Sequence, residues 1–193
     1  MTAQFNDRVH YEGGWYDLAG INGDGLFEPS DYGMEPRSNC SACWRGYVAH
    51  YEVRGNQLLL KTLHVNATRL VSEETGEEQF GIPATLGNAE PLLEGAGMFD
   101  SAYVDADLVL AFMGGLLIAR GFIRDLYVHM GFPPAWKYEY VHELEFENGR
   151  LVRHTDVSPK LSEVREKFRQ DPSAMRGYGE EWIEKCFSRG YEL

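Results

Sequence analysis

Aromatic and imidazole side chains gather in the second half of the chain, at spacings that suit acid–base or ligand-binding chemistry. The run YVHMGF at 127–132 leads through two prolines into a segment that alternates aromatic and acidic residues. Because alternate residues of a strand point to the same face, imidazoles and phenols on neighbouring strands would meet. Such groups transfer protons or line a ligand pocket. An aromatic core with hydrogen-bonded histidines is the alternative. We predict a ligand-binding cluster of Tyr127, His129, Trp136, Tyr140 and His142.

Two short segments carry side chains of the kinds that bind metal ions. Read from Gly20 as a twelve-residue calcium loop, the first segment has oxygen ligands at the third and fifth places and an acid at the last, but glycine stands where the first ligand belongs. A turn after a strand is the alternative. The second segment has the Cys-x-x-Cys spacing of half a zinc site or a redox pair, and no second such pair exists. We predict no bound metal and no cofactor; the residues concerned are Asn22, Asp24 and Asp31 for calcium, and Cys40 and Cys43 for zinc.

The charge of the chain bears on its partners. Its 193 residues include 18 basic and 30 acidic ones, a formal net charge of −12, and the acidic excess lies in residues 1–157. Such a surface repels phosphate backbones, so we expect no nucleic-acid binding and consider a basic protein or peptide the better partner. A stripe of acids could receive that partner, or could form ion pairs with Arg150 and Arg153 on the next strand. The stripe comprises Glu139, Glu143, Glu145 and Glu147.

Targeting features are few. The first residues contain no apolar signal segment, and the longest apolar stretch, 108–118, is too short to span a bilayer. Three cysteines are an odd number, which does not suggest a disulfide framework. We therefore expect a cytoplasmic protein with reduced thiols and no membrane association.

Turn and strand signals predict the architecture. Gly55-Asn56 and Asn148-Gly149 are typical of two-residue hairpin turns. A Gly-Gly motif precedes each hairpin, and in the second half it indicates a bulge or a close approach of two backbones. We predict a single α+β domain over 1–193, in which two β-rich repeats form a curved antiparallel sheet or barrel-like pair and two C-terminal helices pack on it. The parts are repeat one at about 9–65, an acidic connector at about 66–107, repeat two at about 108–157 and a helical tail at 158–193.

Two segments resemble a group of uncharacterised bacterial proteins. They are ACWRGY at 42–47, and GGLL at 114–117 together with YVHMGF at 127–132; the likeness spans roughly 9–157. The resemblance implies a compact bacterial domain and supplies no catalytic residues. Gly13-x-Trp15 also resembles the opening of lipocalins, although the duplicated layout departs from that fold.

The motifs of the common enzyme classes are missing from the chain. It contains no Gly-rich phosphate loop, no zinc-protease motif and no dinucleotide fingerprint. We therefore favour a non-enzymatic binding protein, for instance an immunity or inhibitor protein for a basic toxin. One alternative is a small-molecule-binding protein or enzyme with an aromatic and histidine pocket at the seam between the repeats. The other is a self-associating structural module, a homo-oligomer that pairs exposed sheet edges.

Overall fold

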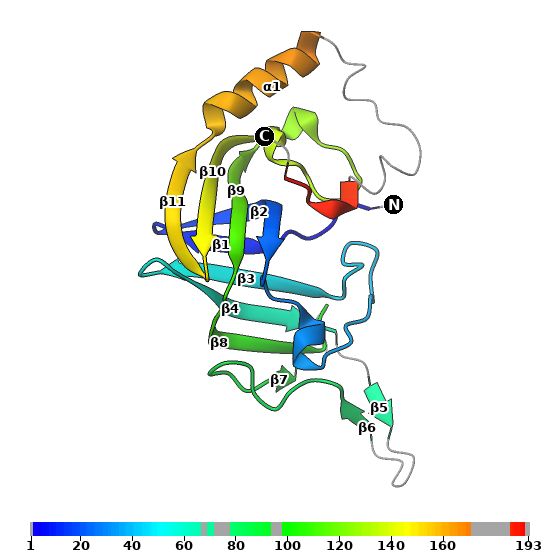
Figure 1. Ribbon diagram of the computed structural model, residues 1–193. Coiled ribbons are helices and arrows are strands. Elements are labelled where there is room, and N and C mark those ends of the chain that lie inside the picture. Colours follow the sequence, from blue (N-terminus) through cyan, green and yellow to red (C-terminus); the bar gives the residue numbers. More distant parts are fainter. Residues whose placement is uncertain (1, 67–68, 72–77, 94–97, 171–185, 192–193) are drawn as a thin grey trace.

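The chain forms an α+β fold around a closed seven-stranded β-barrel (Figure 1). The computed structural model describes residues 2–66, 69–71, 78–93, 98–170 and 186–191. Its elements are β1 (Arg8–Tyr11), β2 (Gly14–Asp24), η1 (Pro29–Tyr32), β3 (Tyr47–Arg54), β4 (Gln57–Val65), β5 (Arg69–Val71), β6 (Glu78–Phe80), β7 (Leu92–Leu93), β8 (Ser101–Val109), β9 (Met113–Phe122), η2 (Arg124–Leu126), η3 (Ala135–Lys137), β10 (Tyr138–Glu147), β11 (Arg150–Asp156) and α1 (Ser158–Gln170). The barrel order is β11-β10-β9-β2-β1-β3-β4, β8 and β7 extend the sheet beyond β4, and β5 pairs with β6 separately.

The two predicted hairpin turns are confirmed, and together they close the barrel. Gly55-Asn56 joins β3 to β4, Asn148-Gly149 joins β10 to β11, and all four residues have positive φ, as this tight turn requires. The tips then bond to each other. Leu58 N donates to the carbonyl of Gly149 at 2.8 Å, and Leu151 N donates to the carbonyl of Asn56 at 2.7 Å. Turn residues that are 90 or so positions apart therefore supply the last link of the barrel, between β11 and β4.

Glycines let β2 and β9 approach closely, as the Gly-Gly motif at 114–115 indicates. A Cβ on Gly23 would lie 2.1 Å from the carbonyl oxygen of Met113, and a Cβ on Gly114 would lie 2.1 Å from that of Asn22. Both glycines also have φ near +140°, a conformation that L side chains rarely adopt. These residues therefore act as a reciprocal pair that only glycine can fill.

One strand pair departs from the predicted antiparallel sheet. β1 runs antiparallel to β2 but parallel to β3, with Arg8 opposite His50 and His10 opposite Glu52. After β2 the chain crosses through η1 and returns along the other side of β1. A long crossover is what a parallel neighbour requires, and nothing local in the sequence marks it.

Apolar side chains form two cores, one inside the barrel and one outside it. Leu18, Leu116 and Leu144 point inward and are completely buried. On the outer face of β9 and β10, a second cluster that includes Val141 packs beneath Leu161 of α1. α1 therefore packs on this cluster through Leu161, while most of its length extends beyond the end of the barrel (Figure 1).

The predicted helical tail is present in part. α1 begins at Ser158, and Phe168 packs against Trp136 with ring centroids 4.9 Å apart. Most of the second predicted C-terminal helix lies outside the described residues, and residues 186–188 are helical.

The segment predicted as an acidic connector contains strands: β5, β6 and β7 lie within it, and most of β8 forms its end. Residues 101–109 form β8, whose Asp107 accepts from Arg54 at 3.0 Å and from Lys61 at 3.1 Å. Asp105 and Asp107 both have positive φ, which aspartate tolerates better than most residues. Their acidity therefore reflects bulges and ion pairs in a strand. The duplication of two β-rich repeats stays a prediction.

Gly114→Ala tests the reciprocal glycine pair. The added Cβ would collide with the carbonyl of Asn22, so we expect the free energy of unfolding to fall by about 2 kcal/mol or more. Gly13→Ala is the matched control, since Gly13 has φ +74° but no atom within 4 Å of its Cβ, and should lose only about 1 kcal/mol. Urea unfolding measures both, and equal losses would mean that backbone strain, not contact, sets the requirement.

Candidate functional site

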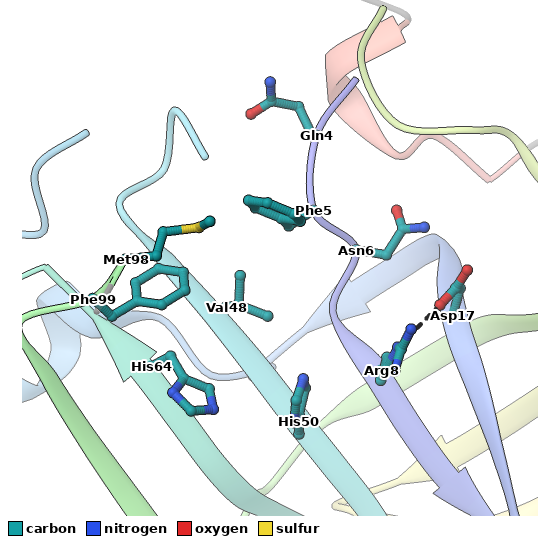
Figure 2. A pocket seen from close by; sticks show the side chains of 10 residues that line it. All are labelled: Gln4, Phe5, Asn6, Arg8, Asp17, Val48, His50, His64, Met98 and Phe99. Carbon is teal, nitrogen blue, oxygen red and sulfur yellow. Dashed lines mark hydrogen bonds and ion pairs between the residues drawn. The ribbon is translucent and has the colours of Figure 1, made fainter. Parts of the chain in front are cut away.

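A groove of about 590 Å³ crosses the outer face of β1, β3 and β4, on the side of the barrel away from its interior core (Figure 2). Apolar side chains lie toward one end and polar side chains toward the other, with two imidazoles below them. The volume falls in the range of small-molecule sites. The lining residues are Gln4, Phe5, Asn6, Arg8, Asp17, Val48, His50, His64, Met98 and Phe99.

Imidazole and aromatic rings continue from the groove along the sheet as an unbroken row. Each ring contacts the next at centroid distances of 5.1 to 5.7 Å. The row arises because outward-pointing positions of β2, β1, β3 and β4 fall side by side, and Phe99, two residues before the start of β8, adds a phenyl ring. In order it comprises His10, Trp15, His50, His64 and Phe99.

The polar end of the groove combines one ion pair with neutral imidazole. Burial, together with the nearby His64 and Arg8, lowers the pKa of His50, so its ring is neutral near pH 7. Arg8 contacts Asp17 at 3.4 Å, and the other oxygen of Asp17 accepts from the hydroxyl of Tyr138 at 3.0 Å. The groove can therefore offer hydrogen bonds from a neutral ring beside a partly engaged guanidinium.

The wall formed by residues 4–6 is fixed by hydrogen bonds to two loops. Gln4 N donates to the carbonyl of Gly131, and the Gln4 side chain donates to Ser41 O at 2.8 Å and accepts from Trp44 N at 2.9 Å. The backbone N–H of Phe5 donates to the carbonyl oxygen of Ala42, the residue after Ser41. The wall is thus preorganised, which reduces the entropy lost when a ligand binds.

A buried carboxylate anchors this wall from below. Asp7 is 1% exposed and accepts two hydrogen bonds from Arg45, one from Arg189 at 2.6 Å and one from Ala49 N at 2.8 Å. Burial alone would raise the pKa of Asp7, but the two guanidiniums and Ala49 N–H outweigh it and lower this pKa from 3.8 to about 2. Asp7 is therefore ionised in the folded protein.

The sequence motifs ACWRGY at 42–47 and YVHMGF at 127–132 meet at this anchor. Arg45 of ACWRGY and Arg189 both lie over the ring of Phe132 of YVHMGF, at 5.3 and 5.0 Å. Trp44 stacks on Phe187 with centroids 4.7 Å apart. In this structure the motifs join the N-terminal segment to residues 186–191.

The structure places the five predicted ligand-binding residues in three locations. The hydroxyl of Tyr127 and Nδ1 of His129 lie 2.7 Å apart in an exposed loop, and Trp136 packs against α1. Tyr140 and His142 lie at the barrel end next to the β1–β2 turn. There they belong to what we call the barrel-end cluster: Tyr11, Tyr16, Arg120, Tyr140, His142 and His154.

The residues considered for metal binding occupy other kinds of structure. Asn22 and Asp24 lie in β2 opposite β9, not in a loop, and Asp31 lies in η1. Cys43 is buried, and burial raises the pKa of its thiol, whereas Cys40 is partly exposed. Over the described ranges, no group of three or more His, Cys, Asp or Glu side chains could hold a metal ion.

The acidic stripe is partly engaged within the chain. Glu145 pairs with Arg153 across β10 and β11, as the alternative predicted, and Glu143 accepts from the hydroxyl of Tyr191. Glu139 and Glu147 are exposed.

The groove itself was missed from the sequence. Each histidine stands between two apolar residues in β3 and β4, as in Ala49-His50-Tyr51 and Leu63-His64-Val65, which was a signal for one polar position on the outer face. The register that aligns these strands with residues 4–6 has no such local signal.

Comparison of the chain with protein-family models, curated proteins and solved structures found no match. Across the described residues, the helices are too short or too polar to cross a membrane.

Asp7→Asn should destabilise the protein by about 3 kcal/mol, because it leaves two guanidiniums without their buried counter-charge. Asp125→Asn, at an exposed position, should change stability by less than about 0.5 kcal/mol. Thermal and urea unfolding measure both. A loss under about 1 kcal/mol for Asp7→Asn would show that the ion pairs do not hold the fold.

The same carboxylate predicts a pH dependence. The folded-state pKa of about 2 lies below the unfolded value of 3.8, so the contribution of Asp7 is complete above about pH 4 and is lost as pH falls toward 2. This shift corresponds to about 2 kcal/mol. The difference in unfolding free energy between wild type and Asp7→Asn should therefore shrink over this range; a constant difference would contradict the ionised anchor.

Proposed function

We propose that this chain is a non-enzymatic protein that binds a small molecule in the outer groove. The ligand has a flat apolar part and at least one hydrogen-bonding group. The observation that carries the proposal is the pairing, within one groove of about 590 Å³, of an apolar end with two imidazoles. Pockets with mostly apolar walls and a few placed polar groups are typical of such sites.

The exposure of the apolar end supports this proposal. The side chains of Phe5 and Met98 are 40% and 47% exposed, although both line the groove. Covering apolar surface gains about 25 cal/mol per Å², so a ligand ring between these side chains would be stabilised by their burial. Methionine and aromatic side chains also adapt to the shape of a flat ligand.

The groove receives more support than the acidic stripe as a binding surface. A basic protein partner would have to compete with Arg153 for Glu145 and with Tyr191 for Glu143. A ligand at the apolar end of the groove would not have to compete in this way, because the exposed side chains of Phe5 and Met98 are apolar and have no polar partner that the ligand must displace.

Indole is a suitable first probe, since it is flat, apolar and carries one N–H donor. We expect it to shift the ring NMR signals of His50 and His64, and Phe5→Ala to weaken its binding about tenfold by removing one wall. Tyr127→Ala is the matched control, because Tyr127 is 55% exposed and belongs to the cluster predicted from the sequence.

The two variants separate the candidate sites. Binding that survives Phe5→Ala but is lost in Tyr127→Ala would move the ligand to the 127–129 loop and refute the groove. An absence of any shift at His50 and His64 with indole would also refute it.

A further inference from the structure

The guanidinium of Arg8 dominates the polar end of the groove. Its side chain is 56% exposed, and Nε makes one long contact, 3.4 Å, with the carboxylate of Asp17. The two terminal nitrogens of Arg8 have no acceptor among the described residues. A guanidinium with unused N–H groups can bind a planar anion through two parallel hydrogen bonds.

Two imidazoles continue the row of donors from Arg8 across the sheet. Arg8 lies opposite His50 in the parallel pairing of β1 and β3, and the ring of His50 contacts that of His64 on β4 at 5.7 Å. Figure 2 shows His50 between Arg8 and His64 at the base of the groove. The ring nitrogens of these histidines form no hydrogen bond with the described part of the chain. Because every imidazole carries at least one N–H, both rings can donate to a ligand.

The acceptors at this end of the groove are already engaged. One oxygen of Asp17 contacts Arg8, and the other accepts from the hydroxyl of Tyr138 at 3.0 Å. The Gln4 side chain bonds to the loop before β3. The Asn6 amide nitrogen donates to the same Tyr138 hydroxyl at 3.2 Å, and the amide oxygen is buried. A ligand group that meets this end of the groove therefore finds mainly donors.

The charges around the groove wall also favour an anion. Asp7, buried beneath the wall, pairs with both Arg45 and Arg189, so this group has one more positive charge than negative. Farther along the row of rings, Glu52 is paired with Arg54. The wall thus carries a local excess of positive charge in a chain whose net charge is −12.

On the basis of the proposed function, we propose that the flat ligand of the outer groove is an aromatic carboxylate. Its ring lies among the apolar side chains of Phe5, Met98 and Phe99. Its carboxylate accepts hydrogen bonds from the terminal nitrogens of Arg8 and from the ring of His50. An amine at the same place would meet the guanidinium of Arg8 and find no free carboxylate.

Three indoles with different charges test this proposal on the full-length protein: indole-3-acetate, neutral indole-3-acetamide and cationic tryptamine. Ring signals of His50 and His64 in ¹H–¹³C spectra measure the binding of each. We expect indole-3-acetate to bind about tenfold or more tightly than the amide, and tryptamine to bind most weakly. The preference for the acetate should shrink as salt is added, because ions screen the contact with Arg8.

Three variants test the role of the guanidinium. Arg8→Gln should weaken the binding of indole-3-acetate about tenfold or more and leave that of indole-3-acetamide nearly unchanged. Arg153→Gln is the matched control, because Arg153 is 63% exposed, pairs with the carboxylate of Glu145 and lies outside the groove; it should change neither affinity. Asp17→Asn should strengthen acetate binding several-fold, because it releases Arg8 and removes a negative charge beside the ligand.

The results distinguish the charge of the ligand from the existence of the site. Equal affinities for indole-3-acetate and its amide, or unchanged acetate binding in Arg8→Gln, would overturn the carboxylate and leave the groove as a site for a neutral ligand. Tighter binding of tryptamine would overturn it in favour of a cation held by Asp17. Unchanged His50 and His64 signals with all three indoles would reject the groove itself. Thermal unfolding of every variant confirms that a loss of binding is not a loss of fold.

Discussion

The buried carboxylate of Asp7 is the interaction on which the rest of the structure depends. Removing a charge from water costs several kcal/mol, and that cost is offset only when every oxygen lone pair finds a donor. Arg45 and Ala49 N–H, four residues apart, and the distant Arg189 supply those donors. The N-terminal segment, the loop before β3 and residues 186–191 are therefore held together by one charge, and the groove wall stands on that junction.

Alternation along a single short strand then creates two different surfaces. In β1, His10 points outward into the row of rings, while Tyr11 points inward to the hydrogen-bonded imidazoles. The outer position adds to the row of rings, and the inner one adds to the packed interior of the barrel. A four-residue strand thus contributes to both the outer row of rings and the interior of the barrel.

Features that depend on neighbouring residues could be predicted from the sequence, and features that depend on distant ones could not. The turn at Asn148-Gly149 and the close approach at Gly114 follow from local conformational rules. The ligand-binding prediction placed Tyr127 and His129 on a strand beside that of Tyr140 and His142, but residues 127–130 lie in an exposed loop, so these side chains do not meet. The groove depends on β1 lying parallel to β3, a register set by contacts far apart in the chain.

The bond between Asp7 and Arg189 spans 182 positions, which bears on how the protein assembles. During synthesis from the amino end, Arg189 is made only after all the strands. Until then, Arg45 is the one of these two guanidiniums that can pair with the Asp7 carboxylate. The link between the hairpin tips likewise joins residues 92 positions apart. A topology with so many distant pairings folds slowly, because loop-closure entropy is lost before the contacts form. Premature association of half-made barrels through unpaired strand edges is thus the main hazard during biosynthesis of this chain.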